Sequence, residues 1–178
     1  CRACKSGSSA TLLTNSIIKK SSYSGEVHGG DQLGGLVGTA WDTSLIEESF
    51  SEGLVSGDNV VGGLIGYCTW NFPPQPNTTN VVRNSYSRAN VVATGIAAGG
   101  FYGSPEMNVA IENCYSTGTV VAPYADGSAG GFIGKTINDT SVLNSYYDSE
   151  SSEMANAIGE YNEEDPNISV EAKTTSAM

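Results

Sequence analysis

One short pattern recurs four times along this chain and constrains its fold more than any other feature. In each copy an apolar residue and a polar stretch lead to a Gly-Gly pair, two apolar or aromatic residues and a closing glycine. The pairs are Gly34-Gly35, Gly62-Gly63, Gly99-Gly100 and Gly130-Gly131, closed by Gly38, Gly66, Gly103 and Gly134. Repeats of this length are typical of solenoids, in which stacked units bury a core that one unit alone cannot form.

The repeat units are in phase with one another. They span residues 18–38, 46–66, 82–103 and 111–134, with a partial unit at 142–147. A small residue recurs at positions 25, 53, 89 and 118, which gives spacings of 28, 36 and 29 residues. Each unit offers three short β-like stretches separated by glycines, where corners need positive φ or close backbone approach. The pattern predicts an all-β fold, a parallel β-solenoid of four to five rungs with about 28–37 residues each.

Length and composition set the frame around this solenoid. We expect residues 1–15 to form an N-terminal cap, residues 16–147 the solenoid and residues 148–178 an acidic C-terminal tail or cap. The net charge of −11 and the pI of about 4.3 argue against nucleic-acid and anionic-membrane partners. No apolar run approaches the roughly 20 residues that span a bilayer. The chain starts at Cys1 without a methionine, so we expect a processed product or a segment of a longer protein.

Aligning the units predicts columns of like residues. An aliphatic column is followed two places on by a polar column and two further on by a largely aromatic column, and alternation would place all three on one face of a strand. The columns are Ile18, Ile46, Val82, Ile111 and Val142; Lys20, Glu48, Asn84, Asn113 and Asn144; and Ser22, Phe50, Tyr86, Tyr115 and Tyr146. We expect stacked asparagine amides to hydrogen-bond between rungs and stacked aromatic rings to add to the stability.

The opposite face carries a column of charges with alternating sign. It reads Lys19, Glu47, Arg83 and Glu112. Opposite charges on neighbouring strands attract and like charges repel. Exposed ion pairs contribute only about 0–1 kcal/mol each, so we expect this column mainly to fix the register.

The four cysteines fall into two groups. Cys1 and Cys4 form a C-x-x-C pair without the βα context of a redox motif or the second pair that zinc requires. Either a local or terminal disulfide or a reduced pair is compatible with the sequence. Cys114 falls in a column of serines and lies two rungs from Cys68, a separation of about 9–10 Å that exceeds the usual Cα limit for a disulfide. We predict that Cys114 is a free, packed thiol.

Candidate binding residues lie outside the repeats. The proline-rich loop at 67–80 contains Trp70 and Phe72, and exposed aromatic rings commonly anchor sugars or protein partners. The alternative is that both rings fold against the side of the solenoid. Asp148, Glu150 and Glu153 could bind calcium, but they lack the spacing and turn glycine of a calcium loop. A solvated acidic face is the alternative there, and we expect no other cofactor.

The sequence offers little support for catalysis. His28 is the only histidine, and no residue with its chemistry recurs at its position in the other units. The metalloprotease, serine-hydrolase and phosphate-loop motifs are missing. Hydrolysis by paired carboxylates needs two acids within roughly 5–10 Å, whereas the acids of the repeats are spread along columns beside cations. We therefore predict that the chain is not an enzyme.

The repeated string resembles the GLUG motif, which occurs in large bacterial surface proteins, adhesins and haemagglutinin-like proteins. It reads IEESFSEGLVSGDNVVGGLIG in the second unit and IENCYSTGTV, then AGGFIG, in the fourth, and the resemblance covers about residues 16–148. Ser22 replaces the usual aromatic residue and Ala89 the usual glycine. Such repeats also flank the catalytic region of some immunoglobulin-A-cleaving metallopeptidases, but the resemblance brings no zinc motif, catalytic residue or ligand residue to this chain. The C-terminal tail is similar to the segment that follows the last repeat in such proteins.

These observations lead to three functional hypotheses. The first is a non-enzymatic module at an extracellular or cell surface, bacterial or archaeal, that acts as an adhesin, spacer or assembly component. The second is a self-assembling fibre subunit, and the third a polysaccharide-active or ice-binding β-helix. The expected partners are other domains of a longer chain, identical subunits, or a host protein or glycan.

Overall fold

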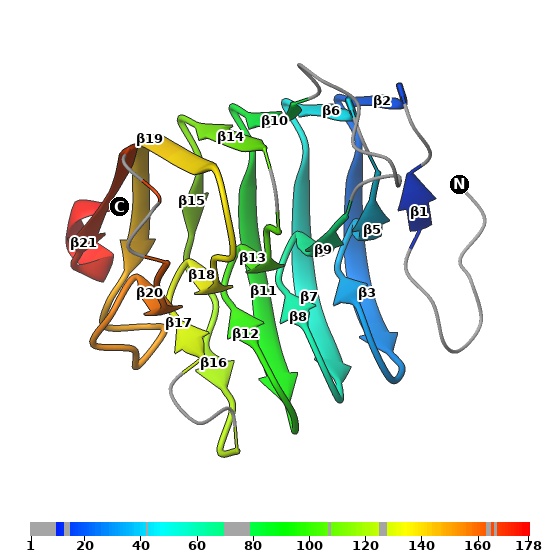
Figure 1. The fold of residues 1–178 in the computed structure, drawn as a ribbon. Helices are drawn as coiled ribbons and strands as arrows, with labels where there is room; N and C mark the ends of the chain where they lie inside the picture. The colour runs from blue at the N-terminus through cyan, green and yellow to red at the C-terminus, as the bar shows by residue number, and fades with distance from the viewer. Residues whose placement is uncertain are drawn as a thin grey trace.

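The chain folds into a parallel β-solenoid of about five turns, which confirms the predicted fold (Figure 1). The computed structural model describes residues 10–12, 15–41, 43–69, 79–106, 108–124, 128–162, 165 and 167–178. Strands account for 56% of the structure and helix for 2%, which places the chain firmly in the all-β class. The turns follow one another along the solenoid axis from the N-terminal to the C-terminal end (Figure 1).

The described strands belong to three parallel sheets. One sheet runs in the order β1 (Ala10–Leu12), β5 (Val37–Ala40), β9 (Ile65–Cys68), β13 (Tyr102–Ser104), β18 (Ile133–Lys135) and β20 (Ile158–Glu160). A second runs β2 (Ile17–Lys19), β6 (Leu45–Glu47), β10 (Asn80–Arg83), β14 (Val109–Glu112), β19 (Thr140–Asp148), β15 (Tyr115–Ser116), β11 (Tyr86–Ala93), β7 (Phe50–Gly57) and β3 (Ser22–His28). Strand β16 (Val120–Val121) pairs with β11, and β21 (Asn167–Lys173) with β19. The third runs β17 (Ala129–Gly130), β12 (Ala98–Gly99), β8 (Val61–Gly62) and β4 (Leu33–Gly34), and a short 3-10 helix, η1, spans Thr175–Ala177.

The turns stack in the register that the repeat spacing predicts. Gly53 pairs with Gly25 in the turn before it and with Ala89 in the turn after it. Ile111 pairs with Val142, so the partial fifth unit also stays in phase. Like residues therefore lie above one another, and the backbone amides of each turn bond to the next.

The polar column forms a left-handed corner in every turn, including at Asn144, which lies within strand β19. Its residues all have φ between 48° and 53°, and they are Lys20, Glu48, Asn84, Asn113 and Asn144. One left-handed residue between two extended segments shifts the alternation of side chains. Residues an even number of places apart on the two sides of the corner therefore face opposite ways, one into the core and one outward. Ile46 is consequently buried at 1% exposure, whereas Phe50 points outward and is partly exposed. The prediction that the three columns share one face is therefore wrong.

The asparagine amides still bond between turns at this corner. Asn113 Nδ2 donates to Asn84 Oδ1 at 3.3 Å, which confirms the predicted amide stacking for that pair. Asparagine tolerates the left-handed conformation better than lysine or glutamate does. The corners at Lys20 and Glu48 thus place residues of ordinary preference in a conformation that costs energy.

The Gly-Gly pairs make a second corner through close backbone approach. In each turn the first glycine ends a two-residue strand, and the next strand begins three residues later. A Cβ on Gly63 would lie 2.1 Å from the Gly100 carbonyl oxygen and 2.2 Å from Ser87 Oγ. These paired glycines, all of them described, do not use the left-handed region. The first three turns therefore have four strand segments each in place of the three stretches expected, and the fourth has five because its long strand is divided into β15 and β16.

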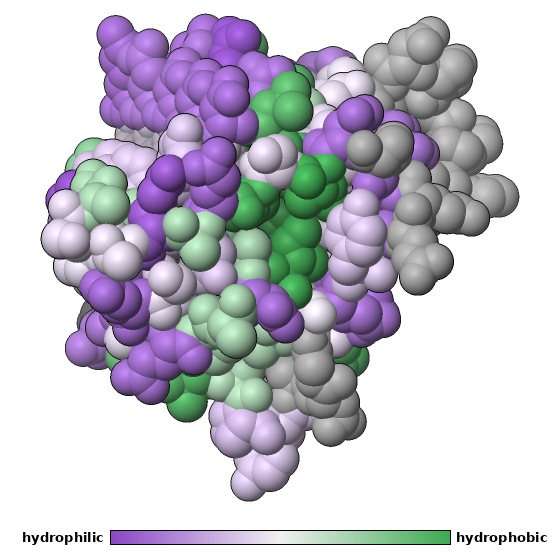
Figure 2. Space-filling model, turned by 90° about the vertical axis from the view of Figure 1, so that its left-hand side faces the viewer, coloured by the Kyte–Doolittle hydropathy of each residue, from purple (hydrophilic) through white to green (hydrophobic). Residues whose placement is uncertain are grey.

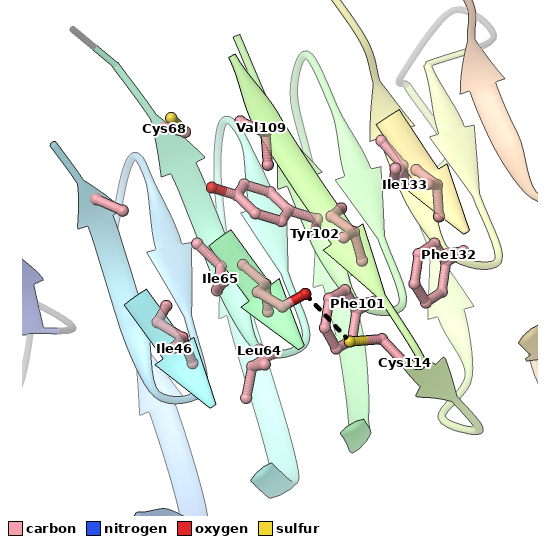
Figure 3. Packing of buried hydrophobic residues seen from close by; sticks show 14 of the residues in the cluster. Ile46, Leu64, Ile65, Cys68, Phe101, Tyr102, Val109, Cys114, Phe132 and Ile133 are labelled. Carbon is pink, nitrogen blue, oxygen red and sulfur yellow. Dashed lines mark hydrogen bonds between the residues drawn. The ribbon is translucent and has the colours of Figure 1, made fainter. Parts of the chain in front are cut away.

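The core consists of two apolar clusters with polar serines between them. The larger contains Phe101 and Phe132, whose ring centroids lie 4.7 Å apart with planes 2° from parallel. Figure 3 shows these rings beside Ile65, Tyr102 and Ile133 inside the solenoid. The smaller cluster is built from aliphatic residues and alanines of the long strands and of the short strands beside them: Leu33, Val55, Val61, Ala89, Val91, Ala93, Ala98 and Val120.

Tyrosines close the column of serines at both ends. The inward column of Ser51, Ser87 and Ser116 begins with Tyr23 and carries Tyr147 in the fifth turn. Ser51 and Ser116 each donate a hydrogen bond of 2.7 Å to a glycine carbonyl across the corner. Tyr147 is 3% exposed and its hydroxyl donates to the Ala155 carbonyl at 3.1 Å. The larger rings of Tyr23 and Tyr147 fit at the two ends of the column because no further regular turn packs against them there.

The chain continues to add strands after Asp148. Strand β20 extends the sheet of β18, and β21 pairs with β19 with an irregular register between Val142 and Ser145. Strand β21 consequently skips the left-handed corner that the other turns share. Its apolar residues Ile168 and Val170 are only partly buried against the core. Figure 2 shows an apolar band flanked by hydrophilic residues at this end of the molecule.

Candidate functional site

The outward-facing aromatic column forms a ladder on the surface of the solenoid. Phe50, Tyr86 and Tyr115 begin β7, β11 and β15 and pair in register. The ring centroids of Phe50 and Tyr86 are 4.7 Å apart and those of Tyr86 and Tyr115 are 4.9 Å apart, with interplanar angles of 4° and 5°. All three side chains are partly exposed. We call these three residues the aromatic ladder.

Arg88 is fixed across the ladder by contacts to three turns. Its guanidinium carbon lies 4.9 Å from the Tyr86 ring centroid, Nη1 is 3.4 Å from Glu52 Oε1, and Nη2 donates to the Tyr115 hydroxyl at 3.5 Å. The side chain is still 53% exposed. A guanidinium this close to an aromatic ring is held by cation–π attraction and keeps donors free for a ligand. Burial raises the pKa of Tyr86, so its hydroxyl stays protonated.

The ladder is one edge of a broad face made by the outward side chains of β3, β7, β11, β15, β16 and β19. We call this the long-strand face (Figure 1). At its other edge Val92 pairs with Val121, which is 49% exposed. Ile96 and Tyr124, in the turns that follow β11 and β16, are 60% and 71% exposed. Val92 and Val121 therefore lie on the same face about 20 Å along the strands from the ladder.

The charge column pairs as expected over three turns. Glu47 accepts from Lys19 Nζ at 2.7 Å and from Arg83 Nε at 2.8 Å. Hydrogen bonding to Lys19 is the main reason that the pKa of Glu47 is lowered, and Arg83 adds to it. Glu112 is in register with Arg83 but forms no ion pair with any described residue. The column joins three turns electrostatically.

Two of the three acids considered for calcium, Asp148 and Glu150, accept hydrogen bonds within the protein. Asp148 Oδ1 accepts from the amides of Glu150 and Ser151, both at 3.0 Å, and Oδ2 accepts from Ser151 Oγ at 2.8 Å. Burial raises the pKa of Asp148, but these bonds outweigh it and lower the pKa overall. Glu153 is exposed. Within the described residues no three His, Cys, Asp or Glu side chains gather to hold a metal.

The cysteine prediction is confirmed for the described thiols. Cys114 is a free thiol and is buried, as predicted, and Cys68 is buried as well. Cys114 takes the serine position: its amide donates to Ser145 Oγ at 3.3 Å, and its thiol donates to the Glu112 carbonyl at 3.2 Å. Burial raises the pKa of the Cys114 thiol to about 12. Cys1 and Cys4 lie outside the described residues.

The remaining predicted residues have plain outcomes. Trp70 and Phe72 also lie outside the described residues, so the candidate loop stays a prediction. His28 sits on the surface with Nε2 3.1 Å from Glu26 Oε2. Sequence reasoning did not single out Arg88 and Glu52. Their opposite charges at equivalent positions of adjacent units could have predicted an ion pair. That pair could be related to the aromatic residues only once the aromatic column was known to face outward.

Comparisons with known proteins give no further identification. No family model, curated protein or solved structure matches this chain. No helix in the described residues is both long and apolar enough to cross a membrane. What the geometry offers is a partly apolar surface with a stacked row of aromatic rings and an arginine beside it.

Proposed function

We propose that this chain is a non-enzymatic module of an extracellular surface protein that binds a partner protein through its long-strand face. The observation that carries the proposal is the aromatic ladder with Arg88 fixed across it. Tyrosine and arginine are among the residues that dominate binding energy at protein interfaces. Here neighbouring turns already hold them in place, so binding would cost little further conformational entropy.

The extent of the face supports a protein-sized partner. The ladder and the exposed Val121 lie at opposite edges of one surface, and Ile96 and Tyr124 are exposed in the turns beyond. Exposed apolar groups of this kind mark contact sites, and a standard interface buries about 800 Å² on each partner. The resemblance of the repeats to a motif of bacterial surface proteins supports an extracellular location.

The stacking geometry favours a protein over a glycan at this face. A sugar ring packs against an open aromatic face, whereas the faces of Tyr86 are covered by Phe50 and Tyr115. The ladder presents ring edges, hydroxyls and the guanidinium of Arg88 instead. Those groups suit hydrogen bonding and edge contacts with a polypeptide surface.

A self-assembling fibre subunit is the second candidate. The outer edges of β3 and β21 have no strand partner among the described residues, and open edges invite pairing with another chain. Two features favour a discrete module instead. Tyr23 replaces the serine of the inner turns, and β21 skips the corner that a following turn would need to match.

The proposal is tested by binding to arrays of extracellular proteins and of glycans. We compare the wild type with Arg88→Ala and Tyr115→Ser, which change the face, and with Lys135→Ala, a matched surface change on the sheet of β18. We expect protein binding that weakens at least tenfold in both face variants and is kept in Lys135→Ala. Equal binding by all four proteins, or binding to glycans alone, would contradict the proposal. Circular dichroism spectra confirm that each variant is folded.

A further inference from the structure

Asp165, in the segment that leads into β21, is a fully buried carboxylate with an unused oxygen. Its exposure is 0%, Oδ1 accepts from the Thr140 amide at 2.9 Å, and Oδ2 has no hydrogen-bond partner. None of the ion pairs among the described residues involves it. Burying an ionised carboxylate is costly unless a positive charge compensates for the lost hydration.

A second unused oxygen lies on the residue to which Asp165 is bonded. Thr140 Oγ1 is buried, with the residue 1% exposed, and it also has no partner. The hydroxyl is three covalent bonds from the amide nitrogen that binds Asp165 Oδ1. Two oxygens without hydrogen-bond partners, one of them on a carboxylate, therefore occur on two residues of adjacent turns that are hydrogen-bonded to each other.

In another turn of the solenoid, a neutral side chain accepts the equivalent hydrogen bond from a backbone amide of the preceding turn. Asn80 Oδ1 accepts from the Ser44 amide at 3.0 Å, and its Nδ2 donates to Cys68 Sγ at 3.0 Å. Both ends of that amide are thus satisfied. An asparagine would serve equally well at position 165, so the backbone contact does not by itself explain a charged residue there.

The surroundings of Asp165 are fixed by the chain itself. The Asp165 amide donates to the Asn162 carbonyl at 3.0 Å, and the Tyr161 hydroxyl donates to the Asp165 carbonyl. The Asn162 amide donates to Thr136 Oγ1 at 3.0 Å, which ties this segment to the turn below. The two oxygens without hydrogen-bond partners are therefore held in place before any ligand binds.

We propose that Asp165 Oδ2 and Thr140 Oγ1 are ligands of a hard cation bound where the last turn joins the solenoid. Calcium and related hard cations take oxygen ligands, carboxylates foremost among them, and water completes their coordination. The net charge of −11 raises the local concentration of cations. The site is separate from the long-strand face and does not depend on the proposed binding function.

Thermal unfolding with and without calcium tests the site, and isothermal titration measures binding directly. For an affinity of about 1 mM, about 10 mM calcium should raise the Tm of the wild type by about 3–6 °C. Asp165→Asn should lose this rise, while its own Tm stays at or above that of the calcium-free wild type, because the new amide can donate to Thr140 Oγ1. Thr140→Val should reduce the rise, and Glu153→Gln, an exposed acid, should keep it in full.

Two results would overturn the proposal. If calcium, magnesium and sodium all leave the wild-type Tm unchanged and no heat of binding is detected, Asp165 and Thr140 bind no cation. If Asp165→Asn responds to calcium as the wild type does, the ion binds elsewhere on the acidic surface. Because Asp165→Asn keeps the acceptor for the Thr140 amide, loss of the response is not explained by a failure to fold.

Discussion

Replacing Gly62 with alanine should break the stacking at the Gly-Gly corner. A Cβ at this position would lie 1.8 Å from the Ile65 carbonyl oxygen, 2.5 Å from the Gly103 nitrogen and 2.8 Å from the Ile65 carbonyl carbon. All three are backbone atoms, so no side chain can rotate away. Strand β8 is bonded to β4 on one side and to β12 on the other, so the turn cannot move without breaking one of these pairings.

The expected cost follows from this lack of room. Overpacking a core where neighbours can relax costs about 1–3 kcal/mol. Here the contacts are with backbone on both sides, so we expect about 3 kcal/mol or more, which corresponds to a fall in Tm of roughly 6–12 °C for a chain of this size. Gly30→Ala is the matched control, since the nearest atom to its Cβ is Asp58 Oδ2 at 3.8 Å.

Urea unfolding followed by circular dichroism compares the two variants with the wild type. Gly30→Ala should unfold within about 1 kcal/mol of the wild type, because an alanine there meets only ordinary contact and restricts the unfolded chain slightly. Gly62→Ala should unfold at a clearly lower urea concentration. Equal midpoints for the two variants would refute the argument that the Gly-Gly pairs exist for close backbone approach.

Three further predictions concern the corner, the charge column and the serine column. Glu48→Gly should raise the free energy of unfolding by about 1 kcal/mol, because Glu48 has φ of 50°. Glu52→Gly, in an extended strand, should lower the free energy of unfolding. Urea unfolding measures both changes, and the same sign for both would contradict the left-handed corner at Glu48. The pKa of Glu47 is lowered in the folded state, mainly by Lys19, so its stabilisation is present above the unfolded pKa and is lost as the pH falls through the lower folded pKa. Melting curves of the wild type should therefore fall more steeply with acid than those of Glu47→Gln, and parallel curves would argue against the pair. Cys114, with its pKa raised to about 12 by burial, should resist alkylation at neutral pH until the protein unfolds, and labelling of the native protein seen by mass spectrometry would contradict its packed position.

The period of the repeat was enough to predict the fold and the register. The recurrence of a small residue at positions 25, 53 and 89 aligns the turns, because only one offset places like residues together. The position of Cys114 among serines followed from the same alignment. These inferences depend on spacing alone, which is fully visible in a sequence.

The direction of the side chains could not be predicted in the same way. It depends on the conformation of single corner residues, and the residue types of Lys20 and Glu48 do not predict a left-handed φ. The shift that they cause moved the aromatic column from the core to the surface and created the ladder. The role of Asp165 was equally hidden, because it lies after the last repeat and acts through a long-range contact with Thr140.

Disulfide trapping across two turns tests the stacked register most directly. Ser56 and Val92 are paired strand neighbours, so cysteines at these positions should lie about 4.8 Å apart and oxidise to a disulfide within the usual Cα limits. Cysteines at Ser56 and Asn90 are the control, two residues out of register. Peptide mapping by mass spectrometry should find the cross-link in the first variant and free thiols in the second. Cross-linking of the control pair, or of neither pair, would contradict the parallel, in-register solenoid.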